Sequence, residues 1–177
     1  EVWRYKHVLN PFGKSLVILA TEHSKIIGVR AFMRWKWQKG SRIYAAYRAV
    51  DTATHPDHQG KGIFKMLTLR ALEIGCEEGN HFVFNTPNSQ SLPGYLKMGW
   101  EPVGKLVVSV RPSLSNLFSL GENDIDLSTP TVTDGEINDL CEMLNNKNGS
   151  KGNLFTPKSQ KFLRWRYEEN PLQKYTV

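Results

Sequence analysis

The stretch THPDHQGKGIF, residues 54–64, joins the end of a predicted β-strand to the start of a predicted α-helix. The first N–H groups of a helix have no partner within the helix, and together with the helix dipole they attract anions. Gly60 and Gly62 let the main chain approach an anion closely, and Lys61 between them adds a cation. The pattern is typical of a pyrophosphate-binding loop, although two glycines also occur in simple turns. It lacks the spacing of a Walker lysine loop and the third glycine of a dinucleotide fingerprint.

Outward from this loop, the hydrophobic pattern predicts an α/β fold. Apolar or alternating runs predict three antiparallel strands before the loop, over residues 15–21, 25–37 and 42–54. After the loop we expect a helix over 62–78, a strand over 81–84, a helix over 89–98 and a strand over 101–110. The apolar stripe of the 62–78 helix is broad, so this helix is expected to be largely buried. This order of elements implies a mixed sheet with helices packed on it.

The C-terminal third has a different pattern. Residues 1–111 form the predicted core domain, residues 112–130 a turn-rich linker, and residues 131–177 a helical segment. Thr133 followed by Glu136 predicts the start of a helix over 134–145, and Thr156-Pro157 predicts the start of another over 158–168.

A short motif occurs near both ends of the chain. Trp-Arg-Tyr at residues 3–5 is followed by Asn10-Pro11, and Trp-Arg-Tyr at residues 165–167 is followed by Asn170-Pro171. The match spans few positions, so chance or a shared helix-to-strand turn is one explanation. The other is a duplicated unit whose second copy begins near residue 125 and continues past Val177. In a third arrangement, the C-terminal helices fold back and complete the first unit.

Composition limits the class of protein without choosing a function. The 177 residues are 40% hydrophobic and 23% charged, with 14 Gly and 9 Pro, as in an ordinary globular domain. No apolar run is long enough for a membrane span, and we expect a cytoplasmic protein that does not bind membranes. The net charge of +6 is dispersed, which disfavours nucleic acid as a partner. Cys76 and Cys141 fit neither a metal site nor a disulfide framework, so no disulfide is expected.

The residues from Val50 to Gly104 resemble the core of the GNAT acyltransferases. In that family a Val-His-Pro-like strand end and a few polar residues precede Gly-Lys-Gly-Ile, as at residues 60–63 here. About 30 residues downstream a second pattern matches the family's second core helix, through Asn88, Ser91, Tyr95 and Gly99-Trp100. Two positions depart from the family: Asp57 stands where Gln or Arg is common, and Phe64 where Gly or Ala is common. We expect Phe64 to pack into the core.

The resemblance implies the GNAT fold, a mixed and mainly antiparallel sheet with helices on both faces, and acetyl-CoA as cosubstrate. It also implies that main-chain groups at the strand end bind the pantetheine arm, and that the Tyr95 phenol protonates the leaving sulfur. A core tyrosine with a satisfied hydroxyl is the alternative for Tyr95. The residues expected to bind the cofactor are Thr52, Ala53, Thr54, Gln59, Gly60, Lys61, Gly62, Ile63, Asn88 and Ser91.

An amine acceptor must lose a proton before it attacks, and Asp51 is the carboxylate nearest to the strand end. The alternatives for Asp51 are a salt bridge with Arg48 or a solvated acid. His55 and His58 flank the loop, but two histidines without a third ligand do not predict a metal site.

The sequence therefore predicts an N-acyltransferase that moves an acetyl group from coenzyme A to a small-molecule or peptide amine by direct attack in a ternary complex. A homodimer is left open. The alternative is a non-catalytic acyl-CoA-binding or structural module of a tandem GNAT protein, and a third reading, nucleic-acid binding, depends on charge alone.

Overall fold

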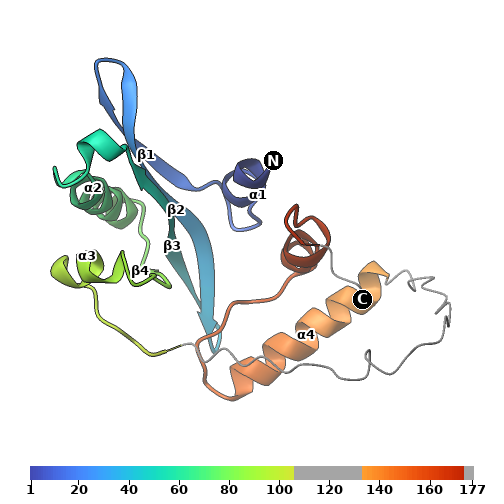
Figure 1. The fold of residues 1–177 in the computed structure, drawn as a ribbon. Helices are drawn as coiled ribbons and strands as arrows, with labels where there is room; N and C mark the ends of the chain where they lie inside the picture. Colours follow the sequence, from blue (N-terminus) through green and yellow to red (C-terminus); the bar gives the residue numbers. More distant parts are fainter. Residues whose placement is uncertain (106–132, 174–177) are drawn as a thin grey trace, which may run out of the picture.

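The computed structural model describes residues 1–105 and 133–173, and within them it contains one four-stranded sheet in the order β1-β2-β3-β4 (Figure 1). Strands β1 (Leu16–Glu22), β2 (Lys25–Lys39) and β3 (Arg42–Thr54) are antiparallel, and β4 (Phe82–Phe84) is parallel to β3. The first four of the five predicted strands therefore form, and the predicted fold class is confirmed.

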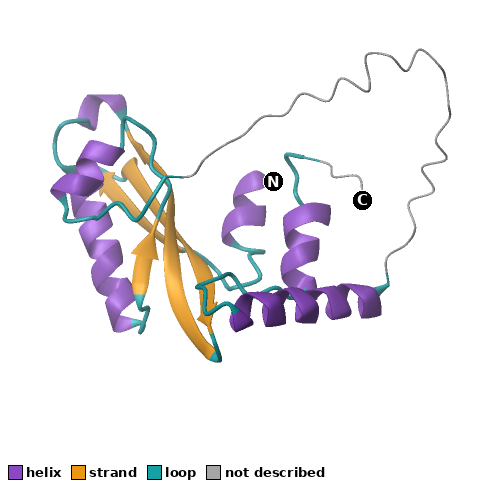
Figure 2. Cartoon of the chain, turned by 90° about the horizontal axis from the view of Figure 1, so that it is seen from below, coloured by secondary structure: helices purple, strands orange, loops and turns teal. Residues whose placement is uncertain are grey.

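Helices cover both faces of the sheet (Figure 2). On one side lie α2 (Ile63–Glu77) and α3 (Leu92–Lys97). The short 3-10 helix η1 (Pro56–His58) precedes α2. On the other side lie α1 (Val2–His7), α4 (Asp134–Ser150), α5 (Gln160–Leu163) and the π-helical turn η3 (Arg164–Glu168). None of the helices in the described ranges is long and apolar enough to cross a lipid bilayer.

Helix α2 packs on the sheet through one face only. Ile63, Leu67 and Ala71 are buried, and Gly28 of β2 leaves room for them, since a Cβ there would lie 2.7 Å from Cγ2 of Ile63. The expectation of a largely buried helix is wrong, because Met66 is 57% exposed. The apolar stripe in the sequence is wider than the contact with the sheet.

Strands β3 and β4 separate after a short pairing. Hydrogen-bonded partners run only from Ala46 opposite Phe82 to Arg48 opposite Phe84. Beyond Arg48, β3 continues to Thr54 beside β2, and β4 has ended. The backbone of residues 49–54 therefore keeps one edge without a strand partner among the described residues, and this opening positions the candidate site.

The C-terminal helices contact α1 and β2. The rings of Tyr5 and Trp165 stack at 4.9 Å, and Phe162 packs against Trp35 of β2 at 5.9 Å. The Tyr5 hydroxyl donates to the carbonyl of Trp165, and Nε1 of Trp165 donates to the carbonyl of Tyr5. The two Trp-Arg-Tyr motifs thus bind each other directly. Leu163 packs against the same cluster, so this segment folds back on the first unit, and a duplicated second unit stays a prediction.

Several helices and strands begin or end at residues other than those predicted from the sequence. The capping box of Thr133 and Glu136 is confirmed, but α4 continues to Ser150 instead of ending at Asn145. The following helix starts at Gln160 because the Ser159 side chain caps it, and Thr156-Pro157 precedes it in extended chain. Residues 101–105 are not in a strand, and residues 106–110, the linker 112–130 and the end of the chain from 174 lie outside the described residues.

Candidate active site

The loop that leads into α2 exposes its main chain at two glycines. Gly60 and Gly62 have φ values of 75° and 77°, in the left-handed region that favours glycine. Gly62 is the N-cap of α2, so the first N–H groups of the helix face out of this loop. A Cβ at either glycine would meet no atom within 4 Å, which shows open space in front of the backbone. This geometry can hold the pyrophosphate of a coenzyme.

The side chains around the loop form only long contacts, and most of them are exposed. Nζ of Lys61 lies 3.4 Å from Nδ1 of His58, and the carboxylate of Asp57 lies 3.8 Å from His55. Asp57, the unusual acid, is 83% exposed at its side chain and therefore points away into solvent. Phe64 packs edge-on against Tyr95 at 5.4 Å, which confirms that this ring turns inward.

A cavity of about 380 Å³ lies where β3 and β4 separate. It brings together five of the predicted site residues: Asp51, Thr52, Asn88, Ser91 and Tyr95. The other predicted residues are not among its lining and follow the end of β3 and the loop: Ala53, Thr54, Gln59, Gly60, Lys61, Gly62 and Ile63. The predicted site therefore has two parts, a main-chain loop and a cavity lined by side chains.

Asn88 and Ser91 support the entry into α3. Oδ1 of Asn88 accepts hydrogen bonds of 2.9 Å from both the backbone N–H and the hydroxyl of Ser91. Within the described residues, Nδ2 of Asn88 makes no hydrogen bond, so a donor remains for a ligand. Part of the pattern that resembles the family thus has a local structural role.

Tyr95 is buried at the wall of the cavity and is bound from behind by Arg30. Nη2 of Arg30 donates a 2.6 Å hydrogen bond to the phenol oxygen. Arg30 is fully buried on β2, and its Nε and Nη1 have no hydrogen-bond partner among residues 1–105 and 133–173. Its guanidinium lies 5.4 Å from the rings of Phe64 and of Tyr95, so aromatic faces surround the cation. Burial lowers the pKa of Arg30 from its ordinary value.

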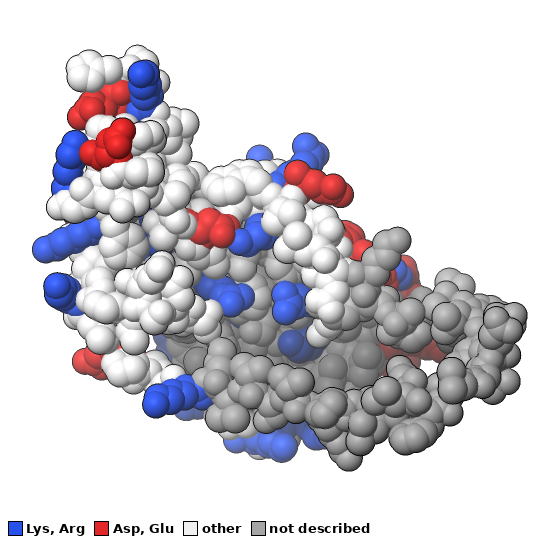
Figure 3. Space-filling model, in the orientation of Figure 1, with Lys and Arg blue, Asp and Glu red and all other residues white. Residues whose placement is uncertain are grey.

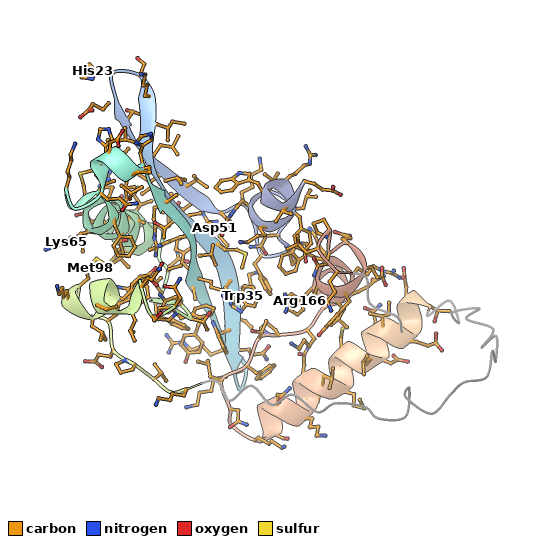
Figure 4. All side chains as sticks on the ribbon, in the orientation of Figure 1. His23, Trp35, Asp51, Lys65, Met98 and Arg166 are labelled. Carbon is orange, nitrogen blue, oxygen red and sulfur yellow. The ribbon has the colours of Figure 1, made fainter. Side chains whose placement is uncertain are left out.

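Asp51 is held by α1 and does not pair with Arg48. Nε2 of His7 lies 2.8 Å from its carboxylate and Nζ of Lys6 lies 2.6 Å from it. The hydrogen bond with His7, and then that with Lys6, lowers the pKa of Asp51 to about 2. Nδ1 of His7 contacts the hydroxyl of Ser15 at 2.9 Å, so both ring nitrogens have partners. Figure 4 places Asp51 on the sheet, on the side of α1.

Three of these groups were missed from the sequence. Lys6 and His7 are separated from Asp51 by more than forty residues, and no periodic pattern linked them to it. Arg30 had a signal, since it alternates with Gly28 and Phe32 on the buried face of an apolar strand. A charged residue at such a position indicates a specific partner.

The mixed sheet, its separating strands and the glycine loop before a helix define the fold class of the α/β acyltransferases. Residues 3–103 match the family model described as the acetyltransferase (GNAT) domain, and the chain belongs to this family.

Solved structures with similar folds include three acetyltransferases. An aminoglycoside acetyltransferase from an uncultured soil sample is 22% identical with a TM-score of 0.45, over 55% of this chain and 66% of that chain. Glucosamine-6-phosphate N-acetyltransferase from Arabidopsis thaliana is 15% identical with a TM-score of 0.48, over 54% and 66%. A predicted acetyltransferase from Clostridium acetobutylicum, solved with acetyl-CoA, is 18% identical with a TM-score of 0.48, over 56% and 64%.

Each of these alignments covers slightly less than two thirds of the solved structure. The similarity is too low to transfer a substrate. No curated protein sequence matches this chain.

Proposed function

We propose that this chain is an acetyl-CoA-dependent N-acyltransferase that acetylates a primary amine by direct attack. The observation that carries the proposal is Tyr95 in the lining of the cavity, with its hydroxyl oxygen bound by Arg30. The thioester would lie along residues 52–54, on the edge of β3 that has no strand partner in the described ranges, where main-chain N–H groups would polarise its carbonyl. The pyrophosphate would lie on the loop at Gly60 and Gly62.

The hydrogen bond from Arg30 restricts the direction in which the hydroxyl proton of Tyr95 can point. Arginine is only a donor, so the phenol oxygen accepts from it, and the hydroxyl proton of Tyr95 must point elsewhere. The cavity is the open side of the residue. In the reaction the amine nitrogen bonds to the carbonyl carbon, the carbon–sulfur bond breaks, and the sulfur takes this proton. The guanidinium stabilises the negative charge left on the oxygen until solvent returns a proton.

Asp51 fits an electrostatic role better than that of a strong base. With a pKa of about 2 it is ionised at neutral pH and holds a proton only weakly. Its charge would attract the ammonium group of the acceptor into the cavity, and the proton that the amine must lose would leave through water.

Two measurements test the proposal. Acetyl-CoA should raise the melting temperature of the protein, and an amine panel should then produce free thiol in proportion to acetylated amine. Stabilisation without thiol release from any amine would favour the non-catalytic acyl-CoA-binding module. Absence of stabilisation would contradict both functions.

A further inference from the structure

Three cations from distant parts of the chain lie close enough to repel one another, and one of them lines the cavity. Arg48 belongs to β3 and lines the cavity, Lys158 precedes α5, and Arg166 lies in η3. Figure 3 shows Lys and Arg side chains gathered in the hollow between the sheet and the C-terminal helices. We call these three residues the cationic cluster.

Aromatic rings fix the place of the cluster. The guanidinium of Arg48 lies 5.9 Å from the ring of Trp35, and this ring lies 5.9 Å from that of Phe162. Nζ of Lys158 lies 5.0 Å from the same Phe162 ring. Arg166 belongs to the same C-terminal segment as Phe162, and Figure 4 places it on the side of the sheet that faces this segment. Burial lowers the pKa of Arg48 and of Lys158, and the charge of Arg166 lowers both further, as expected for neighbouring like charges.

The cluster lacks a counter-ion in the part of the chain that the structure describes. None of its members forms an ion pair there, whereas nearby Arg164 binds both Asp134 and Glu168. Arg48 and Lys158 are half-buried and Arg166 is exposed, and holding these like charges together is unfavourable unless an anion binds among them. The cluster is therefore suited to an anionic ligand.

The lining of the cavity contains both a cation, Arg48, and a carboxylate, Asp51. Asp51 lies three residues along β3 from Arg48, a separation of about 10 Å between their Cα atoms in an extended strand. A ligand with an ammonium group near Asp51 would reach the cluster with a group at a similar distance. We infer that the cationic cluster binds an anionic group, a phosphate or a carboxylate, of the acceptor amine. This inference depends on the proposed function, because it names the class of the acceptor.

Matched pairs of amines test the inference. 6-Aminohexanoate is compared with hexylamine for the carboxylate, and 6-aminohexyl phosphate with 6-aminohexanol for the phosphate. At low ionic strength, kcat/KM should be about tenfold higher for at least one anionic member, because a charge-assisted pair forms with the cluster. The arm with the larger ratio identifies the anion. Equal or lower values for both anionic amines would overturn the inference.

Variants connect the preference to the cluster. Arg166→Gln and Lys158→Gln should each reduce the anionic-to-neutral ratio about tenfold, with unchanged affinity for acetyl-CoA in calorimetry. Arg164→Gln is the matched control, because it removes a charge that is already paired, and it should keep the ratio. A ratio that survives both cluster variants would also overturn the inference.

The anion site can also be tested by binding if the protein shows no turnover. In the complex with coenzyme A, 6-aminohexyl phosphate should bind more tightly than 6-aminohexanol in calorimetry, and Arg166→Gln should weaken only the phosphate. Such a result would support the anion site while the proposed function fails. Equal binding of both compounds would reject the anion site on its own.

Discussion

The loop of residues 54–64 and the cavity between β3 and β4 contribute to the candidate site in different ways. The loop offers backbone groups from one continuous segment, with two glycines in left-handed conformations. The cavity depends on side chains from separate segments, such as Arg30 bound to Tyr95 across 65 positions and Lys6 bound to Asp51 across 45. The loop should therefore be sensitive to the loss of glycine and tolerant of other changes, whereas the cavity should be sensitive to single side-chain atoms.

The largest expected effect is at the loop glycines. Gly60→Val or Gly62→Val should weaken acetyl-CoA binding at least about 100-fold, because a side chain would occupy the open space in front of the backbone. Titration calorimetry of the folded variants measures this.

Gly79→Val is the control for backbone strain. Gly79 follows the other end of α2 with a φ of 75°, the same as Gly60, and a Cβ there also meets open space. This variant should lose similar stability and keep its affinity for acetyl-CoA. Equal loss of affinity in both variants would mean that strain, and not close approach, explains the loop.

The next effect is chemical and belongs to the cavity. Tyr95→Phe should lower kcat by roughly one to three orders of magnitude with little change in acetyl-CoA affinity, since it removes one proton donor. Steady-state kinetics on a confirmed amine measures it. Tyr44→Phe is the control, because Tyr44 contacts His81 and is not among the cavity residues. A change in kcat within twofold would make Tyr95 a packing residue.

A smaller effect is expected from Arg30, which we propose positions Tyr95. Arg30→Met should lower kcat about tenfold with KM nearly unchanged, and Arg30→Lys should restore part of the loss because it keeps one donor. Stability should change little, since removing a buried cation with two unpaired nitrogens relieves a desolvation penalty.

A double-mutant cycle separates positioning from packing. If Arg30 acts through the phenol, Arg30→Met should have no further effect on kcat in the Tyr95→Phe background. Additive losses in kcat would show that Arg30 acts independently of Tyr95.

The difference between the loop, which is one continuous segment, and the cavity, which is formed by separate segments, also explains which features could be predicted from the sequence. Strand alternation before the loop, the helix start at Gly62 and the Thr133–Glu136 capping box depend on neighbouring residues, and these predictions were confirmed. The partners of Asp51 could not be predicted from the sequence. Helix α1 precedes β1, and it comes close to Asp51 on β3 only when β1, β2 and β3 have folded into the sheet. Arg48, one alternative partner for Asp51 in the sequence analysis, lies instead against the ring of Trp35. Contacts across a folded sheet depend on packing that no local pattern encodes.

The smallest expected effect is at Asp51, which lines the cavity. Its pKa is lowered from 3.8 to about 2, first by the hydrogen bond with His7. A lowered carboxylate pKa stabilises the fold above the ordinary pKa, and this contribution is lost as the pH falls through about 2. Because the side chain is 41% exposed, solvent screens the interaction, and we expect about 1 kcal/mol at pH 7.

Urea unfolding of Asp51→Asn across pH measures this contribution. The variant should be less stable than the unmodified protein at pH 7, and the difference should shrink as the pH falls from 4 toward 2, where the carboxylate becomes protonated. Asp57→Asn is the matched control, because the Asp57 carboxylate is 83% exposed and its contact with His55 is long, at 3.8 Å. Its stability should match that of the unmodified protein at both ends of the range. If the stability difference between Asp51→Asn and the unmodified protein stays constant between pH 7 and pH 2.5, the shape of the Asp51 side chain, and not its charge, stabilises the contact with α1.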